Sequence, residues 1–350
     1  MDIQSMDKIN QELLNMIQSD FPLEERPFFV LGNRLNITEQ EVIERLNILK
    51  GEVIRQISAI FDTKSLGYKS SLVAAKIEPN RIDEAAEIIN QHPGVSHNYK
   101  RNHQYNLWFT IAVPPNSRLG LEKTVEILGQ MAGAVEIRLL PTLKLFKIGV
   151  QLDVTGKTTK SKSETTDAFS ERKQRKTVEP LTDQEIKIIR ALQRDIAIIP
   201  EPFAEIAKDA NVTVSELLDY ASAFKEKGQM RRFAAVLHHR KAGFKANGMG
   251  VWRVPEEMQV EIGEKMASYQ AVSHCYLRPI YPDWPYNVFT MVHGRDEEEV
   301  EEILQMIEKE TGITDRFVLY STKEYKKIRV KYFTHEMIDW EEKVIKELKI

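Results

Sequence analysis

Apolar side chains recur at helical spacing near the start of the chain and again after its middle. Two sets stand three or four residues apart: Ile9, Leu13, Leu14 and Ile17, then Ile186, Ile189 and Leu192. Side chains at this spacing lie on one face of an α-helix. Each set therefore predicts an amphipathic helix that opens a folded unit.

A second kind of pattern marks helix starts. Thr38-Glu39-Gln40-Glu41 and Thr213-Val214-Ser215-Glu216 both place a glutamate three residues after a threonine. In such a capping box, the two side chains satisfy free amides at the beginning of a helix. Together with the preceding helices and a tight turn, these starts predict a helix-turn-helix in each part of the chain.

Behind each helix-turn-helix, short apolar segments alternate with helical ones. We expect a strand pair and then strand, helix, strand, strand, helix and strand. The helices of the first copy are expected at 82–90 and 121–131, and those of the second at 255–268 and 296–311. This order is typical of a ferredoxin-like βαββαβ unit. The predicted fold class is α+β, with a helix-turn-helix plus ferredoxin-like module present twice.

Matching segments support the duplication. VSHNY from Val95 matches VSHCY from Val272, and YNLWFT from Tyr105 matches YNVFT from Tyr286 with one residue fewer. Between the copies, a stretch rich in Ser, Thr, Lys and Glu has too few apolar residues to fold alone. The predicted parts are a helix-turn-helix at 1–60, a ferredoxin-like domain at 61–153, a flexible linker at 154–180, a second helix-turn-helix at 181–232, and a ferredoxin-like domain with a C-terminal helix at 233–350.

The charges argue against DNA as a partner. The net charge is -3, which does not favour a polyanion over the whole chain. The helix expected to enter a major groove carries Glu39, Glu41 and Glu44, and its counterpart carries Glu216 and Asp219. Acidic side chains on that face oppose the phosphate contacts on which DNA affinity depends. We therefore expect no DNA binding.

The remaining bulk features indicate a cytoplasmic protein. The single cysteine, Cys275, excludes a disulfide within the chain and favours a reducing compartment. The first residues have no apolar signal core. No apolar run approaches the roughly 18 residues of a membrane-spanning helix, so no membrane association is expected.

Candidate chemistry is concentrated in three clusters of cationic, aromatic and histidine side chains. The first cluster is His97, Tyr99, Arg101 and His103; the second is His238, His239, Arg240 and Lys241; the third is His274, Tyr276 and Arg278, with His293 on the next strand. The segment around the second cluster adds further binding candidates: Arg231, Arg232, Lys245, Asn247, Met249 and Trp252. On a strand, residues two apart share a face. Gly248 and Gly250 would let the backbone come close to a ligand. The set predicts a wall that binds a large, flat polyanion.

Structural alternatives exist for each residue. A single strand histidine is more often a satisfied surface or core residue, and Tyr99 and Tyr276 could be cross-strand packing residues. Zinc is disfavoured, because His-x-Tyr-x-Arg has no standard ligand spacing and cysteine ligands are absent. We find no Gly-rich phosphate loop, nucleophile elbow or dinucleotide motif. The recurrence of the same set in both copies favours a binding role.

The chain resembles the siroheme decarboxylases of the alternative haem and haem d1 pathways, which are Lrp/AsnC-like proteins without regulatory function. The first half resembles one subunit type through VSHNYKRNHQYNLWFT. The second half resembles the other through RRFAAVLHHRKAGFKANGMGVW, VSHCYLRP and DWPYNVFTMVH. The two types usually form a heterodimer, and here they are fused. Phe61-Asp62 stand where His238-His239 stand in the second half, which puts an equivalent first-half site in doubt.

The resemblance implies removal of the two acetate carboxyls of siroheme at C12 and C18, so siroheme and its decarboxylated product are the expected partners. It implies His238 or His239 as proton donor, with Arg240, Lys245 and Arg278 holding carboxylates. His274 and Tyr276 are further candidates for acid or orienting roles, and the first-half cluster would complete the pocket or form a degenerate one. No further cofactor is expected, since the reaction is redox-neutral and the substrate carries the iron.

Three questions stay open at this point. An imidazole could ligate the siroheme iron instead of donating a proton, and this is the only metal contact expected. The two halves are expected to pair within the chain, which leaves a homodimer open. A tetrapyrrole-sensing regulator without turnover is the alternative function, and a structural or assembly partner is the third.

Overall fold

The computed structural model describes residues 6–19, 21–148, 179–237 and 246–349. The predicted linker therefore lies outside the described residues, except for Glu179 and Pro180. The same holds for four predicted site residues, His238, His239, Arg240 and Lys245. Within the described part of the chain, no helix has both the length and the apolar character needed to span a membrane.

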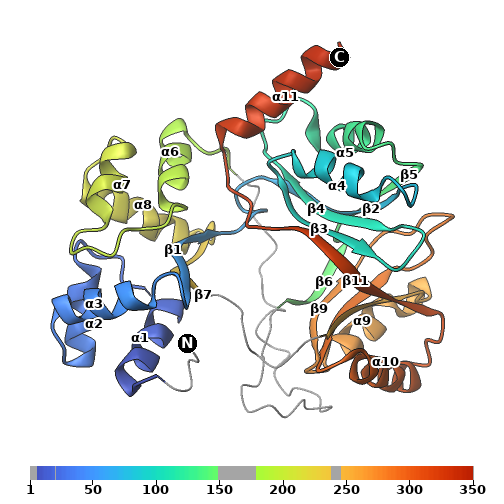
Figure 1. Ribbon diagram of the computed structural model, residues 1–350, viewed down its shortest axis with the longest axis horizontal. Helices are drawn as coiled ribbons and strands as arrows, with labels where there is room; N and C mark the ends of the chain where they lie inside the picture. Colours follow the sequence, from blue (N-terminus) through green and yellow to red (C-terminus); the bar gives the residue numbers. More distant parts are fainter. Residues whose placement is uncertain (1–5, 20, 149–178, 238–245, 350) are drawn as a thin grey trace.

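Two helix-turn-helix units lie beside each other at one end of the molecule (Figure 1). The first consists of α1 (Lys8–Ser19), α2 (Pro27–Leu35) and α3 (Glu39–Leu49), and the second of α6 (Asp183–Leu192), α7 (Phe203–Asp209) and α8 (Val214–Glu226). Both share one core of apolar side chains. Strands β1 (Ile54–Phe61) and β7 (Met230–Leu237) pair antiparallel. The strand pair expected within each copy is thus formed between the copies.

The two predicted capping boxes differ. The Thr213 hydroxyl accepts from the Glu216 amide, and the Glu216 carboxylate accepts from the Thr213 amide, so this box is confirmed. The Thr38 hydroxyl accepts from the Glu41 amide in the same way. The Glu41 carboxylate, however, pairs with Arg45 one turn further along. The first box is therefore only half formed, because a nearby cation competes for the glutamate.

The ferredoxin-like order is confirmed in both halves. The first half contains β2 (Lys69–Lys76), α4 (Ile82–Asn90), β3 (Val95–Arg101), β4 (Leu107–Val113), α5 (Gly120–Met131) and β5 (Glu136–Leu140). The second contains β8 (Ala246–Trp252), α9 (Gln259–Ala267), β9 (Val272–Leu277), β10 (Val288–Gly294), α10 (Glu297–Thr311) and β11 (Arg316–Lys327). Helix α9 begins later than predicted, after a short 3-10 turn at Glu256–Met258.

The two halves exchange the ends of their last strands. Strand β11 pairs first with β8 of its own half and then with β3 of the other half. Strand β6 (Lys144–Ile148), which follows β5, pairs with β9. The result is one nine-stranded sheet in the order β5-β2-β4-β3-β11-β8-β10-β9-β6. The halves therefore pair within the chain, through hydrogen bonds of both exchanged strands.

The sheet folds so that its two halves face each other. Helices α4 and α5 pack on the outer face of the first half-sheet, and α9 and α10 pack on the outer face of the second. The inner faces meet in a separate core that joins Trp108 and Leu140 to Met249, Phe289 and Leu319. This interior, bounded by strands of both halves, is where the candidate site lies.

The C-terminal helix crosses to the first half. Helix α11 (His335–Leu348) follows the second ferredoxin-like unit in sequence, but Trp340 and Val344 belong to the core of the first. The Trp340 ring meets the buried His92 ring edge to face, with 4.4 Å between centroids. The helix therefore ties the end of the chain to the first-half domain.

Candidate active site

A cavity of about 660 Å³ lies between the facing half-sheets. This size suits a small-molecule ligand or cofactor-like substrate. It is lined by side chains from strands of both halves: Leu72, His97, Tyr99, Arg101, Trp108, Phe109, Thr110, Asn247, Met249, His274, Tyr276, Arg278, Phe289, Met291, His293, Ser321, Thr322, Lys323, Glu324 and Lys327. The cavity is therefore a composite of the two copies, and neither copy encloses it alone.

Strand β3 contributes a ladder of three side chains. Because strand positions alternate between faces, His97, Tyr99 and Arg101 all point to the cavity. The His97 and Tyr99 rings lie 6.2 Å apart between centroids. The Arg101 guanidinium carbon lies 5.7 Å from the centre of the Tyr99 ring. The ladder offers two aromatic faces and a cation in sequence.

Strand β9 repeats this ladder from the other half. The His274 and Tyr276 rings stack with 6.1 Å between centroids, and the Arg278 guanidinium carbon lies 4.7 Å from the Tyr276 ring centre. Tyr99 is paired with Trp108 across β3 and β4, as Tyr276 is with Phe289 across β9 and β10. The two ladders therefore occupy equivalent positions of the duplicated fold.

Two buried arginines are the most unusual feature of the cavity. Arg101 is 7% exposed and Arg278 is 8% exposed. Arg101 donates one hydrogen bond to the Leu319 carbonyl at 3.0 Å, and Arg278 donates one to the Leu140 carbonyl. Their Nε atoms have no hydrogen-bond partner among the described residues. Such buried donors are normally satisfied, so both arginines point to a ligand with acceptor oxygens.

Burial lowers the pKa of both guanidinium groups to about 10. Both remain cations at neutral pH, because that value still lies well above 7. Further charges in the lining come from β11, where Lys323 and Lys327 flank Glu324. The described lining thus holds four Arg or Lys cations and one carboxylate. An anionic ligand fits this balance.

The tyrosines of the ladders remain protonated. Burial, with the nearby Glu324 carboxylate, raises the pKa of Tyr99 to about 12. Burial also raises the pKa of Tyr276, against the opposing effect of Arg278. Both side chains therefore present a neutral ring and an O–H donor at neutral pH.

The histidines are held in their neutral form by burial. Burial, together with the smaller effects of the neighbouring His293 and Lys147, lowers the pKa of His274 to about 4. Burial also lowers the pKa of His97, as does the charge of Lys327. A bound anion would reverse part of this effect, since negative charge favours the imidazolium form.

Four predicted substrate-binding residues lie away from this lining. Strand β3 ends at Arg101, so His103 sits in the following turn, where it packs on Tyr105, Trp284 and Phe317. Trp252 faces the helices of its own half, and its Nε1 donates to Thr290. Arg231 pairs with Asp62 at 2.7 Å, and Arg232 is an exposed residue of β7. His103 lies outside the lining because β3 ends before it, and Trp252 because strand alternation turns it toward the helices. Arg231 and Arg232 lie outside it because β7 pairs with β1 in a separate two-stranded sheet.

Other lining residues had no signal in the sequence. Lys323, Glu324 and Lys327 belong to the last strand of the second half and reach the cavity only because β11 pairs with β3.

The strand pairing also shows which residues of the two halves are equivalent. Thr110 pairs with His97, and Met291 pairs with His274. The structural equivalent of Thr110 is therefore Met291, which corrects the sequence match of Thr110 to Thr290 by one position.

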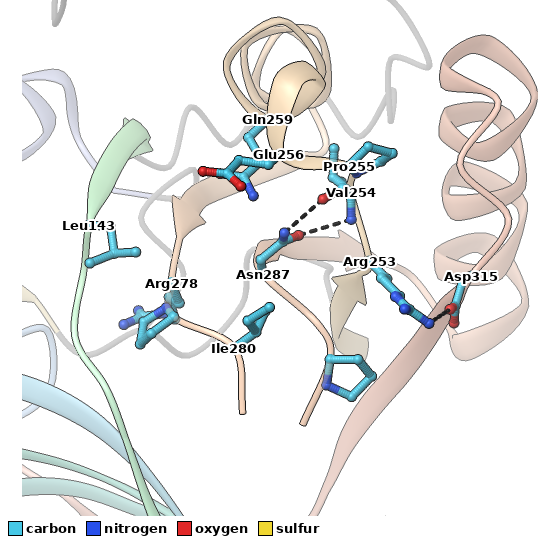
Figure 2. A pocket seen from close by; sticks show the side chains of 12 residues that line it. Leu143, Arg253, Val254, Pro255, Glu256, Gln259, Arg278, Ile280, Asn287 and Asp315 are labelled. Carbon is cyan, nitrogen blue, oxygen red and sulfur yellow. Dashed lines mark hydrogen bonds and ion pairs between the residues drawn. The ribbon is translucent and has the colours of Figure 1, made fainter. Parts of the chain in front are cut away.

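A second cavity, of about 680 Å³, lies behind Arg278, which lines both cavities (Figure 2). Its wall is fixed by Asn287, whose side chain accepts from the Val254 amide at 2.9 Å and donates to the Val254 carbonyl at 2.8 Å. The Asn287 carbonyl also accepts from the Arg278 amide at 2.8 Å. Asn287 thereby holds the backbone from which the Arg278 side chain reaches the intersheet cavity.

Comparisons with known proteins agree with this architecture. A model of the siroheme decarboxylase NirDL-like HTH domain matches residues 10–55 and 185–231, and a model of the AsnC-like ligand binding domain matches 65–147 and 241–326. A siroheme decarboxylase of Hydrogenobacter thermophilus is 38% identical over 335 residues, covering 95% of this chain and 98% of that protein. The chain belongs to the siroheme decarboxylase family. It is accordingly an enzyme of the carboxy-lyase class.

Solved structures of this family have the same overall arrangement. A crystal structure of the siroheme decarboxylase NirDL is 34% identical, with a TM-score of 0.79, and covers 98% of this chain and 100% of that one. A second NirDL crystal structure, in complex with an iron-uroporphyrin III analogue, is 33% identical with the same TM-score of 0.79, covering 97% of this chain and 100% of that one. The duplicated fold is thus shared along nearly the full length.

Proposed function

We propose that this chain removes the acetate carboxyls at C12 and C18 of siroheme, in the intersheet cavity, to give 12,18-didecarboxysiroheme. The observation that carries the proposal is the pair of buried arginines, Arg101 and Arg278, beside flat aromatic rings. Their Nε donors have no hydrogen-bond partner among the described residues. Membership in the siroheme decarboxylase family and the NirDL complex with an iron-uroporphyrin III analogue support it.

Binding follows from the chemistry of a macrocycle with carboxylates around its rim. A guanidinium group binds a carboxylate through parallel hydrogen bonds, so Arg101 and Arg278 would anchor the substrate from opposite halves. Lys327 would add positive charge, whereas the Lys323 ammonium is paired with Asp83 at 2.9 Å. The Tyr99 and Tyr276 rings offer flat apolar surface, and Asn247 and Met249 complete the β8 side of the wall.

The reaction requires one proton for each carbon dioxide released. When the acetate C–C bond breaks, its electron pair stays on the methylene carbon and is delocalised into the macrocycle. A proton added at that carbon gives the methyl group, and no electrons are gained or lost overall. We therefore propose no cofactor beyond the iron that the substrate brings.

His274 is the proton donor that the described residues favour, with Tyr276 beside it as an orienting group. His238 and His239 are the other candidates, with Arg240 and Lys245 as further carboxylate ligands, and all four lie outside the described residues. Any of these imidazoles could instead ligate the siroheme iron. Substitution of each histidine in turn separates these roles, because loss of turnover with binding retained identifies the acid.

The test is an anoxic incubation of siroheme with the wild-type chain and with His274→Ala, His238→Ala and His239→Ala. Wild type should release two carbon dioxide molecules, seen as the loss of two carboxyl groups by mass spectrometry. Removal of the acid should slow turnover by about 100-fold or more. The exposed His335 on α11 provides the control, His335→Ala, which should behave as wild type. Siroheme binding without turnover in the wild type would favour the regulator alternative.

A further inference from the structure

Behind His274, a chain of hydrogen bonds leads to the edge of the cavity. The Ser273 hydroxyl oxygen lies 2.8 Å from His274 Nδ1 and 2.6 Å from His293 Nε2. His293 Nδ1 in turn lies 2.6 Å from the Asn247 amide oxygen. These four residues come from β8, β9 and β10, so strand pairing fixes their order.

The hydrogens in this chain can be arranged in only a few ways. The structure turns the Asn247 amide oxygen toward His293, and in this orientation His293 Nδ1 donates to it, because an amide oxygen only accepts. A neutral His293 then has an unprotonated Nε2, which accepts from the Ser273 hydroxyl. Ser273 has no second proton, so its oxygen accepts from His274 Nδ1. The Met291 carbonyl, 3.4 Å from the Ser273 hydroxyl, is a longer and weaker alternative acceptor.

The consequence concerns the nitrogen of His274 that remains for the cavity. With His293 neutral, His274 carries its proton on Nδ1, and its Nε2 is an acceptor that cannot donate to a substrate carbon. With His293 protonated, Nε2 of His293 donates to Ser273, and Ser273 donates to His274 Nδ1. His274 then carries its own proton on Nε2 and can give it away.

We infer that His293 is a positioning residue that switches the tautomer of His274 through Ser273, and so controls when His274 can act as an acid. The catalytic role of this switch rests on the proposed decarboxylation. The change of His274 tautomer with His293 protonation can be measured in the protein without substrate. His293, on the neighbouring strand β10, would supply the proton while His274 delivers it.

The proton balance closes over one turnover. His274 Nε2–H gives its proton to the methylene carbon as carbon dioxide leaves. Ser273 passes its hydroxyl proton to His274 Nδ1 and takes one from His293 Nε2. The hydrogen-bonded series returns to its neutral arrangement, having lost the single extra proton of His293. A proton from solvent then restores the charged form for the second acetate.

The hydrogen-bonded series Asn247, His293, Ser273 and His274 is called the relay. The charges around it determine how a bound ligand shifts the pKa of His293. Among the described residues, the charged and titratable groups near the relay include His274, Tyr276 and Arg278 from β9 and its end, Lys147 on β6, and Lys323, Glu324 and Lys327 on β11. In the ligand-free protein, burial lowers the pKa of His293, which favours the neutral form. A polyanionic substrate would oppose this effect. Substrate binding thereby favours the tautomer that donates.

The first half lacks the relay. Ala112 occupies the position equivalent to His293. Ile111 pairs with Val95 in the first half as Val292 pairs with Val272 in the second, and Ala112 and His293 are the next residues along their strands. Ser96 lies 3.0 Å from His97 Nδ1, but its other partner is the Thr110 hydroxyl at 2.7 Å. A threonine does not titrate, so Ser96 has no titratable hydrogen-bond partner other than His97 among the described residues. The inference therefore places proton delivery in the second half only.

The first experiment is 15N NMR of the ligand-free, histidine-labelled chain. As pH falls through the titration of His293, the proton of His274 should move from Nδ1 to Nε2. Ser273→Ala should abolish this coupling, and the matched first-half variant Ser96→Ala should keep it. A His274 tautomer that does not change in the wild type, or that still follows His293 in Ser273→Ala, would overturn the inference.

Two further variants keep the test decisive if Ser273→Ala fails to fold. His293→Ala reproduces the residue found at the equivalent first-half position, and should leave His274 in one tautomer until His274 itself titrates. Asn247→Asp places a carboxylate beside His293 Nδ1, which should raise the pKa of His293 and move the tautomer switch to higher pH. A switch at unchanged pH in Asn247→Asp would contradict the proposed chain.

The second experiment measures turnover of siroheme against pH. Ser273→Ala should lower kcat by about 10- to 100-fold with KM little changed, and should remove the His293 titration from the pH profile of kcat. Ser96→Ala should keep the wild-type shape of that profile. Turnover in Ser273→Ala with an unaltered profile would refute the relay while leaving the proposed function intact. No turnover in the wild type would refute the function, and the NMR result would still decide the switch.

Discussion

Replacing Arg278 by methionine should stabilise the ligand-free protein and weaken tetrapyrrole binding at the same time. Arg278 is 8% exposed, and no ion pair or Nε hydrogen bond with a described residue compensates its charge. Burial lowers its pKa from 12.5 to about 10, which corresponds to ~3 kcal/mol of unfavourable free energy for the charged form at neutral pH. Methionine keeps an unbranched, apolar side chain at this position and carries no charge.

The magnitude follows from this cost. Apolar replacement of buried charges is often neutral or stabilising by ~1–4 kcal/mol. We expect Arg278→Met to raise the free energy of unfolding by ~1–3 kcal/mol in urea denaturation without ligand. Loss of a charged hydrogen bond to a carboxylate costs ~1.5–3 kcal/mol, so affinity for iron-uroporphyrin III should fall about 10- to 150-fold in a spectroscopic titration.

Two matched variants sharpen the result. Arg101→Met alters the equivalent first-half position, with 7% exposure and the same lowered pKa of about 10, and should show the same pair of effects. Arg253→Met alters an exposed arginine paired with Asp315 and should change stability by less than ~0.5 kcal/mol. If Arg278→Met lowers stability by more than ~2 kcal/mol, or leaves affinity unchanged, the charge is not held for a ligand.

Two predictions concern the fold around the site. Burial would raise the pKa of Asp62, but hydrogen bonds from Arg231 and Ser65 outweigh it and lower the pKa to about 2. This lowered pKa contributes ~2 kcal/mol of folding stability, which is present above pH 4 and lost as pH falls from about 4 to 2. Asp62→Asn should therefore be less stable than wild type at pH 7 and should lose less stability on acidification. Unfolding followed by circular dichroism at each pH measures both effects. In Gly94→Ala, the new Cβ would lie 2.1 Å from the Ala112 carbonyl oxygen, so thermal unfolding should show a loss of ~3 kcal/mol or more; a Tm equal to wild type would contradict the packing at the start of β3.

The sequence predicted the elements more reliably than the pairing between them. The 3.6-residue stripes and the threonine caps identify helices, because these signals depend on residues within a few positions of each other. The same holds for the ladders of β3 and β9, since alternation alone places Tyr99 between His97 and Arg101 on one face. His103 shows the limit of this reasoning, because nothing local indicates that β3 ends at Arg101.

By itself, therefore, the sequence determined that the chain carries two copies of one α+β module, each with a His-x-Tyr-x-Arg strand. Only the tertiary structure decided that both ladders line a single cavity, because β11 and β6 cross between the halves. That exchange brings Lys323 and Lys327 to the first-half ladder. Only the fold brings His293 near His274, because the hydroxyl of the adjacent Ser273 lies 2.6 Å from His293 Nε2 although the two residues are 20 positions apart. Contacts of this kind depend on strand pairing over long sequence distances, which no local pattern specifies.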